Sequence, residues 1–273
     1  MFFFIHSPKR TTTKGFARFD STDFGFKNKK VFITGCANGI GEEICKSFLE
    51  LGANVYGIDI EKINLKHNNL KKINLDITRY DECEKMIEEL DEENIQIDIL
   101  VNSAGILREG SLPQMPMKEV REVFEVNFFG TLNITQLIVN KMIRNKKGNI
   151  ITISSNSSNT PRLNIGAYGS SKAALNSYMK NLGLEVSKYG IRCNLVSPGS
   201  TLTRMQQSMW KNDDAEKKVI YGNLEKFQIG IPLQKLATRK DIANSVLFLA
   251  SDLSSHITLN ELRVDGGATL GNL

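Results

Sequence analysis

The sequence has few of the side chains from which proteins build metal centres and disulfide frameworks. Its 273 residues include four cysteines and three histidines, which lie far apart along the chain. Four cysteines do not indicate a disulfide scaffold at this length, and their spacing matches no metal-binding motif. An isolated histidine also gives no basis for a Ser-His-Asp triad. The residues concerned are Cys36, Cys45, Cys83, Cys193, His6, His67 and His256. We expect free thiols in a reducing cytoplasm and no metal.

Long apolar segments and concentrated charge are missing as well. The apolar run of residues 1–5 is followed at once by polar and basic residues, and it is too short for a signal peptide or a membrane span. The net charge is +5, but the lysines are scattered and no aromatic residues alternate with them, as they would in a nucleic-acid-binding stripe. We therefore expect neither a membrane nor a nucleic-acid partner. Residues 1–24 lack periodicity and are expected to form a flexible extension.

A nucleotide-binding pattern begins just after this extension. Residues 31–34 are apolar and largely β-branched, as in a buried parallel strand. Gly35, Gly39 and Gly41 follow directly, and a helical pattern then covers residues 42–51. Glycines let the backbone approach a pyrophosphate, and the helix N-terminus attracts its negative charge. The strand, turn and helix together predict a dinucleotide site, in a Gly-x-x-x-Gly-x-Gly variant of the usual spacing.

An acidic residue after the second predicted strand indicates which dinucleotide binds. Residues 54–58 form this strand, and Asp59 comes eighteen residues after Gly41. A carboxylate in this place accepts hydrogen bonds from the adenosine ribose and repels a 2′-phosphate. Residues 36–38 also lack the arginine or lysine that NADP sites often place in the glycine turn. We therefore expect NAD, although Lys62 is close enough to leave NADP open as an alternative.

Four further apolar segments continue an alternation of strands and helices. They cover residues 72–75, 97–101, 149–153 and 191–196, and polar or glycine clusters follow each of them. This rhythm predicts an α/β fold of the Rossmann type, which is a single-domain, doubly wound parallel sheet with helices on both faces. The expected domain covers residues 25–273, and its ligands should bind at the carboxyl edge of the sheet.

One cluster beyond such a strand has the chemistry of a catalytic base. Tyr168 and Lys172 are four residues apart, so a helix would place them on one face, and Ser155 precedes the tyrosine by thirteen residues. A free tyrosine has a pKa of about 10, and an adjacent positive charge favours the phenolate and lowers that pKa. The pair predicts a tyrosine that takes a proton from a substrate hydroxyl, while the serine holds the same oxygen.

With these motifs in order over residues 26–271, the chain resembles the short-chain dehydrogenase/reductase family. One family motif has a second asparagine where this chain has Ser103. The matching residues are Thr34, Gly35, Gly39, Ile40, Gly41, Asn102, Ala104, Gly105, Asn127, Ser155, Tyr168, Lys172, Pro198, Gly199, Asp265, Gly266 and Gly267. The resemblance implies an NAD-dependent oxidoreductase that forms a homotetramer.

The resemblance also implies roles for single residues. Tyr168 would be the general base, and Lys172 would support it and bind the nicotinamide ribose. Asn127, inside a predicted helix, would orient a water beside the lysine. The residues expected to contact NAD are Gly35, Gly39, Ile40, Gly41, Asp59, Asp76, Ile77, Asn102, Ala104, Gly105, Tyr168, Lys172, Pro198, Gly199 and Thr203.

Five less general segments are similar to one branch of the family. Members of that branch oxidise a carboxylated cyclohexadiene diol with NAD and so produce the catechol unit of siderophores. The segments are residues 103–110, 160–162, 197–201, 213–216 and 249–259. This similarity implies a small dihydrodiol substrate, whose carboxylate needs a cationic partner in the site.

Arginine offers a planar fork for such a carboxylate. Arg162, seven residues past Ser155, is the first candidate to bind it and Arg108 is the second, while Ser155 would bind the reacting oxygen. Residues 200–229 are amphipathic and are expected to form a substrate lid. Two alternatives stay open: an alcohol dehydrogenase or 3-oxoacyl reductase that uses NAD or NADP on another substrate, and a nucleotide-binding regulator without catalytic activity.

Overall fold

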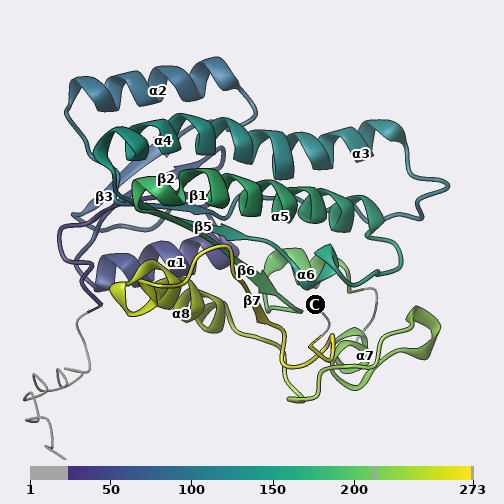
Figure 1. Cartoon of the computed structure of the whole chain (residues 1–273). Coiled ribbons are helices and arrows are strands. Elements are labelled where there is room, and N and C mark those ends of the chain that lie inside the picture. The colour runs from purple at the N-terminus through teal and green to yellow at the C-terminus, as the bar shows by residue number, and fades with distance from the viewer. Residues whose placement is uncertain (1–23, 211, 213, 272–273) are drawn as a thin grey trace, which may run out of the picture.

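Strand pairing organises the molecule around one parallel sheet (Figure 1). The computed structural model describes residues 24–210, 212 and 214–271, so the extension expected over residues 1–24 lies almost entirely outside the described residues. Within them, seven parallel strands pair in the order β3-β2-β1-β4-β5-β6-β7. The strands are β1 (Lys30–Thr34), β2 (Asn54–Asp59), β3 (Leu70–Asn74), β4 (Ile99–Asn102), β5 (Gly148–Ile153), β6 (Ile191–Pro198) and β7 (Glu261–Val264).

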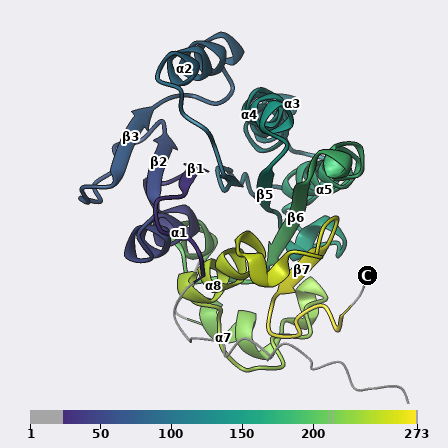
Figure 2. The same cartoon turned by 60° about the vertical axis from the view of Figure 1, so that its left-hand side comes forward.

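Helices cover both faces of this sheet (Figures 1 and 2), which confirms the doubly wound Rossmann-type fold. The helices α2, α4 and α5 lie on one face, and α1 and α8 lie on the other. The side chain of Phe32 in β1 packs in the core between the sheet and helices α2 and α4. The side chains of Val31 and Ile33 pack in the core on the opposite face, with α1 and α8. Strands covered in this way must be apolar on both faces. The helices are α1 (Gly39–Glu50), α2 (Tyr80–Glu92), α3 (Met117–Phe124), α4 (Thr131–Asn145), α5 (Gly166–Val186), α6 (Arg204–Ser208), α7 (Ala215–Tyr221) and α8 (Arg239–Ala250).

The two edge strands differ from the expected pattern. Strand β3 begins at Leu70, two residues before the expected start, and β7 was not predicted. All of β7 is half-buried, and β3 has two half-buried and three exposed positions, so neither strand shows a continuous apolar run. Their conformation depends on pairing with β2 and β6 rather than on local composition.

The order of the strands reverses at β1, and this reversal places the functional site. Strand β1 pairs with β2 on one side and with β4 on the other. The connections from the two halves of the sheet therefore lead away in opposite directions and leave a crevice at the carboxyl ends of the strands. No helix in the described part of the chain combines the length and the apolarity needed to cross a membrane.

Candidate active site

A cavity of about 780 Å³ opens at the carboxyl edge of the sheet. It extends from the glycine turn after β1 and the end of β2 to the segments that follow β5 and β6. Fourteen of the fifteen residues expected to contact the cofactor border it, although they are spread over 169 positions of the sequence from Gly35 to Thr203. The bordering residues are Gly35, Gly39, Ile40, Gly41, Asp59, Asp76, Ile77, Ala104, Gly105, Tyr168, Lys172, Pro198, Gly199 and Thr203.

The glycine turn has no room for side chains at two of its positions. A Cβ atom at Gly41 would lie 2.0 Å from the carbonyl oxygen of Gly35, and one at Gly35 would lie 2.8 Å from the Cα atom of Ala104. Thr34 Oγ1 accepts hydrogen bonds from the backbone N–H groups of Ser103 and Ala104, at 3.1 and 3.2 Å. The turn thus packs directly on the loop after β4. The N-terminus of α1 borders the cavity at this point, which is the arrangement that binds a pyrophosphate.

Asp59, at the end of β2, has both carboxylate oxygens fixed by backbone groups. Its Oδ2 atom accepts from the N–H of Ala37 at 2.8 Å, and Oδ1 accepts from the N–H of Glu61 at 2.8 Å. A carboxylate oxygen can accept more than one hydrogen bond, so each oxygen keeps capacity for a ribose hydroxyl. The two backbone contacts orient the carboxylate before a ligand arrives.

Asn102 is the one expected cofactor residue that does not border the cavity. Its side chain is buried, and Nδ2 donates to the hydroxyl oxygens of Thr135 and Thr152 at 2.9 and 3.2 Å. These two bonds hold the amide nitrogen between the sheet and α4, while the buried Oδ1 has no hydrogen-bond partner among the described residues. The contact with NAD that we expected of Asn102 is therefore not available to its side chain.

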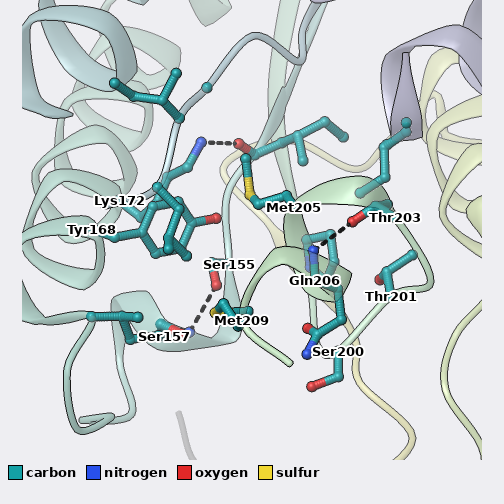
Figure 3. A pocket seen from close by; sticks show the side chains of 18 of the residues that line it. Ser155, Ser157, Tyr168, Lys172, Ser200, Thr201, Thr203, Met205, Gln206 and Met209 are labelled. Atoms are coloured by element: carbon teal, nitrogen blue, oxygen red, sulfur yellow. Dashed lines mark hydrogen bonds between the residues drawn. The ribbon is translucent and has the colours of Figure 1, made fainter. Parts of the chain in front are cut away.

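Ser155, Tyr168 and Lys172 converge on the cavity from two elements (Figure 3). Ser155 lies in the turn after β5, where its Oγ accepts from the N–H of Ser157 at 3.1 Å, and the other two residues lie on α5. Lys172 Nζ donates to the carbonyl oxygen of Ile153 at 2.9 Å and lies 5.9 Å from the centre of the Tyr168 ring. The predicted cluster is thus present as a group of neighbouring side chains.

Burial dominates the pKa values of this pair. It raises the pKa of Tyr168 above its ordinary value, and the hydrogen bond with Ser155 acts in the opposite direction. Burial also lowers the pKa of Lys172 to about 8. The pKa of Tyr168 is therefore raised in this state of the site, where we expected it to be lowered, because the loss of hydration outweighs the hydrogen bond with Ser155.

The lowered pKa of Lys172 predicts a pH-dependent stability difference between the native chain and a Lys172→Met variant. From about pH 8 to the ordinary lysine pKa of 10.5, the unfolded state binds more protons than the folded state. The native chain therefore gains stability as pH rises through this window, while the variant lacks this contribution. Urea unfolding should show that the free energy of unfolding of the variant, relative to that of the native chain, falls by about 2.5 kcal/mol between pH 7 and pH 10. A difference that is constant with pH would contradict the lowered pKa.

Asn127 lies in a π-helical turn, η1 (Glu125–Gly130), which interrupts the expected helix between α3 and α4. Its side chain is fully buried and does not border the cavity. Oδ1 accepts from the N–H of Ile106 at 2.7 Å, while Nδ2 donates to the carbonyl oxygen of Ile106 at 2.9 Å and to Ser171 Oγ at 3.1 Å. The wider turn, a common device at functional sites, thus joins the loop after β4 to the helix that carries Lys172.

The two candidate carboxylate ligands have different environments. Arg108 forms a two-point ion pair with Glu122, with Nη2 at 2.7 Å from Oε1 and Nε at 3.2 Å from Oε2, and it does not border the cavity. Arg162 does border the cavity, and no ion pair of the described residues involves it. Burial lowers the pKa of Arg162, and the carboxylate of Asp265 opposes this effect. The geometry favours Arg162 as the ligand of an anion.

Several described residues of the segment 200–229 border the cavity opposite α5. Thr203 caps α6, because its Oγ1 accepts from the N–H of Gln206 at 3.2 Å. Figure 3 shows Met205 and Met209 across the cavity from the catalytic cluster, with Gln206 beside them. The sequence predicted a lid over residues 200–229 but did not indicate Gln206 as a residue that borders the cavity. A glutamine on an amphipathic segment carries no signal that separates a cavity position from a solvent position.

Comparisons with known proteins agree with this geometry. A family model described as short chain dehydrogenase matches residues 29–214. The 2,3-dihydro-2,3-dihydroxybenzoate dehydrogenase of Escherichia coli (strain K12) is 43% identical over 246 residues, which cover 90% of this chain and 99% of that protein. The vibriobactin-specific enzyme of the same name from Vibrio cholerae is 44% identical over 260 residues, with coverages of 91% and 98%. The ligand-free aldohexose dehydrogenase of Thermoplasma acidophilum is 30% identical, with a TM-score of 0.81 and coverages of 92% and 97%. The chain belongs to the short-chain dehydrogenase family.

Proposed function

We propose that this chain oxidises 2,3-dihydro-2,3-dihydroxybenzoate to 2,3-dihydroxybenzoate with NAD, as a step in the biosynthesis of catechol siderophores. One observation carries the proposal: a single cavity contains Ser155, Tyr168 and Lys172 together with Arg162, a cation without an ion-pair partner in the described part of the chain. The relatives that are 43% and 44% identical, and that are named for this activity, support it.

The residues that border the cavity fit a dinucleotide. The tightly packed glycine turn and the N-terminus of α1 would hold the pyrophosphate, and the oriented carboxylate of Asp59 would hold the adenosine ribose. Asp76 and Ile77 would lie against the adenine, and the segment from Pro198 to Thr203 would lie beside the nicotinamide. When bound, NAD accepts the hydride that leaves the substrate carbon.

The protein side chains would orient the diol and move its proton. Arg162 binds the carboxylate and so fixes the ring, and Ser155 donates a hydrogen bond to the oxygen of the reacting hydroxyl. Tyr168, as the phenolate, accepts the proton of that hydroxyl as the hydride departs from the same carbon. Lys172 stabilises the phenolate when the lysine is charged. Asn127 would contact α5 outside the cavity through its hydrogen bond with Ser171. We expect it to orient a water near Lys172.

The ring of the substrate provides the driving force. Loss of a hydride and a hydroxyl proton leaves a ketone in a cyclohexadiene ring. The ketone then becomes a catechol when a proton leaves the neighbouring ring carbon and another joins the ketone oxygen. The aromatic product is much more stable than the ketone, so the oxidation proceeds forward.

The larger organisation belongs to the same proposal. Residues 25–273 would form one domain, with residues 200–229 as a lid that excludes water from the substrate. We expect a cytoplasmic homotetramer that associates through the helical faces within residues 119–144 and 168–189 and through the C-terminal residues 259–273, of which the last two lie outside the described residues. Phe129 and Leu184, which are 48% and 67% exposed in these regions, support such an association.

The direct test is turnover of 2,3-dihydro-2,3-dihydroxybenzoate by the purified protein. We expect NADH absorbance and catechol fluorescence to rise together with NAD, and NADP to be much poorer. NAD binding without turnover of this diol would contradict the substrate and point to another alcohol or a 3-oxoacyl thioester. NAD binding without turnover of any alcohol would favour the non-catalytic alternative.

A further inference from the structure

We propose that Glu61 is a second carboxylate that determines cofactor specificity, and that it acts with Asp59 to exclude the 2′-phosphate of NADP. This inference rests on the proposed dinucleotide site and adds to it a residue that the glycine pattern does not indicate. It concerns the adenosine end of the cavity rather than the end that contains Ser155 and Tyr168.

Backbone and side-chain contacts hold the carboxylates of Asp59 and Glu61 on the same wall of the main cavity, which is the wall beside the glycine turn. The N–H of Glu61 donates to Asp59 Oδ1 at 2.8 Å, so the chain turns back immediately after β2. The side chain of Glu61 then extends towards the glycine turn, where its Oε2 accepts from Asn38 Nδ2 at 3.3 Å. Asn38, Asp59 and Glu61 all border the main cavity. The hydrogen bond from Asn38 therefore keeps the second carboxylate at the place where the adenosine ribose would bind.

No cation of the described residues forms an ion pair with either carboxylate. The wall therefore presents two negative charges to a ligand. A phosphate monoester carries a charge of about −1.5 to −2 at neutral pH. Repulsion by two carboxylates is thus expected to weaken binding of a 2′-phosphate much more than binding of a 2′-hydroxyl.

Three cations border a neighbouring cavity, and they give a reason for a second carboxylate at the adenosine ribose site. Lys62, Arg204 and Arg239 border a neighbouring cavity of about 520 Å³, and Arg239 is already paired with Glu42 at 3.1 Å. Glu61 borders both cavities, so it lies where the proposed ribose site adjoins the cavity that these cations border. Without Glu61, Lys62 and Arg204 could attract a 2′-phosphate, which is the alternative that Lys62 left open in the sequence.

The test measures binding without turnover. Adenosine 5′-monophosphate and adenosine 2′,5′-bisphosphate represent the adenosine halves of NAD and NADP, and calorimetry gives a Kd for each. Glu61→Gln keeps the size of the side chain and removes its charge. We expect this variant to lower the ratio of the bisphosphate Kd to the monophosphate Kd by about tenfold at low salt, and by less at high salt because the site is exposed.

The matched control is Glu88→Gln, which removes one charge from an exposed position on α2 that borders neither cavity. We expect the control to keep the native ratio. A Glu61→Gln ratio equal to the native one, or an equal fall in the control, would overturn the role of Glu61 while leaving the dinucleotide site intact. Failure of the native protein to bind either nucleotide or NAD would instead overturn the proposed function, and this inference with it.

Discussion

Replacing Tyr168 by phenylalanine is expected to lower kcat by about 10²–10⁴-fold, with a much smaller change in the Kd for NAD. The phenyl ring fills the same space on α5, so packing changes little, but the variant has no oxygen to accept the substrate proton. Steady-state kinetics with the diol would measure the first effect, and quenching of protein fluorescence by NAD would measure the second.

A suitable control for this change lies on the same helix. Tyr178→Phe removes a hydroxyl whose one hydrogen bond within the described residues is a long one from Gln136, at 3.4 Å, and Tyr178 does not border the cavity. We expect this control to keep native turnover. If Tyr168→Phe turned over substrate as fast as the control, the proton would have to leave through another group, and the assignment of the base would fail.

Replacing Arg162 by alanine is expected to raise the KM for the carboxylated diol by about 10²-fold, because a charge-assisted, two-point contact is lost. The value of kcat should change less, since the arginine binds a part of the substrate that does not react. A cyclohexadiene diol without the carboxylate provides the second arm of the experiment. Its KM should be high in the native enzyme and should change little in the variant.

Arg108→Ala is the matched control for Arg162, because the Arg108 guanidinium is already bound by Glu122 and does not border the cavity. Its effect on the KM of the carboxylated diol should be less than about threefold. If Arg108→Ala raised the KM of the carboxylated diol strongly and Arg162→Ala did not, the carboxylate would have to bind at the loop after β4. Equal effects of Arg162→Ala on both diols would show that the arginine does not bind the carboxylate.

The sequence predicts well those parts of the fold where a single local requirement, such as burial on both faces or the lack of space for a Cβ atom, determines the residue type. Strand β1 is covered on both faces, so it had to be an apolar run, and Gly41 had to be glycine because the turn leaves no space for a Cβ atom. Strand β7 has neither property. Its four residues are half-buried and gain their conformation from pairing with β6, so no local pattern marked them as a strand.

In the site, too, features set by local geometry could be predicted, and features that depend on tertiary packing could not. The i, i+4 spacing was enough to bring Tyr168 and Lys172 together on α5, because helical geometry is local. The orientation of Asn102 and the state of the Tyr168 phenol could not be deduced in the same way. The first depends on two hydroxyls from distant elements, and the second depends on how much of the phenol is removed from water. Both are properties of the assembled interior.

The contact between Asn127 and Ile106 resembles the pairing of two peptide units. One side-chain amide both donates to and accepts from a single backbone residue, as a neighbouring strand would do. A replacement must supply a donor and an acceptor side by side. Ionised aspartate lacks the donor, alanine lacks both, and serine carries both on a single oxygen of a shorter side chain. Variants at this position should therefore displace the wall of the cavity near Gly105 as well as any water beside Lys172. A low kcat in such a variant would therefore indicate first that the loop after β4 has moved. It would not by itself show that the water beside Lys172 takes part in proton transfer.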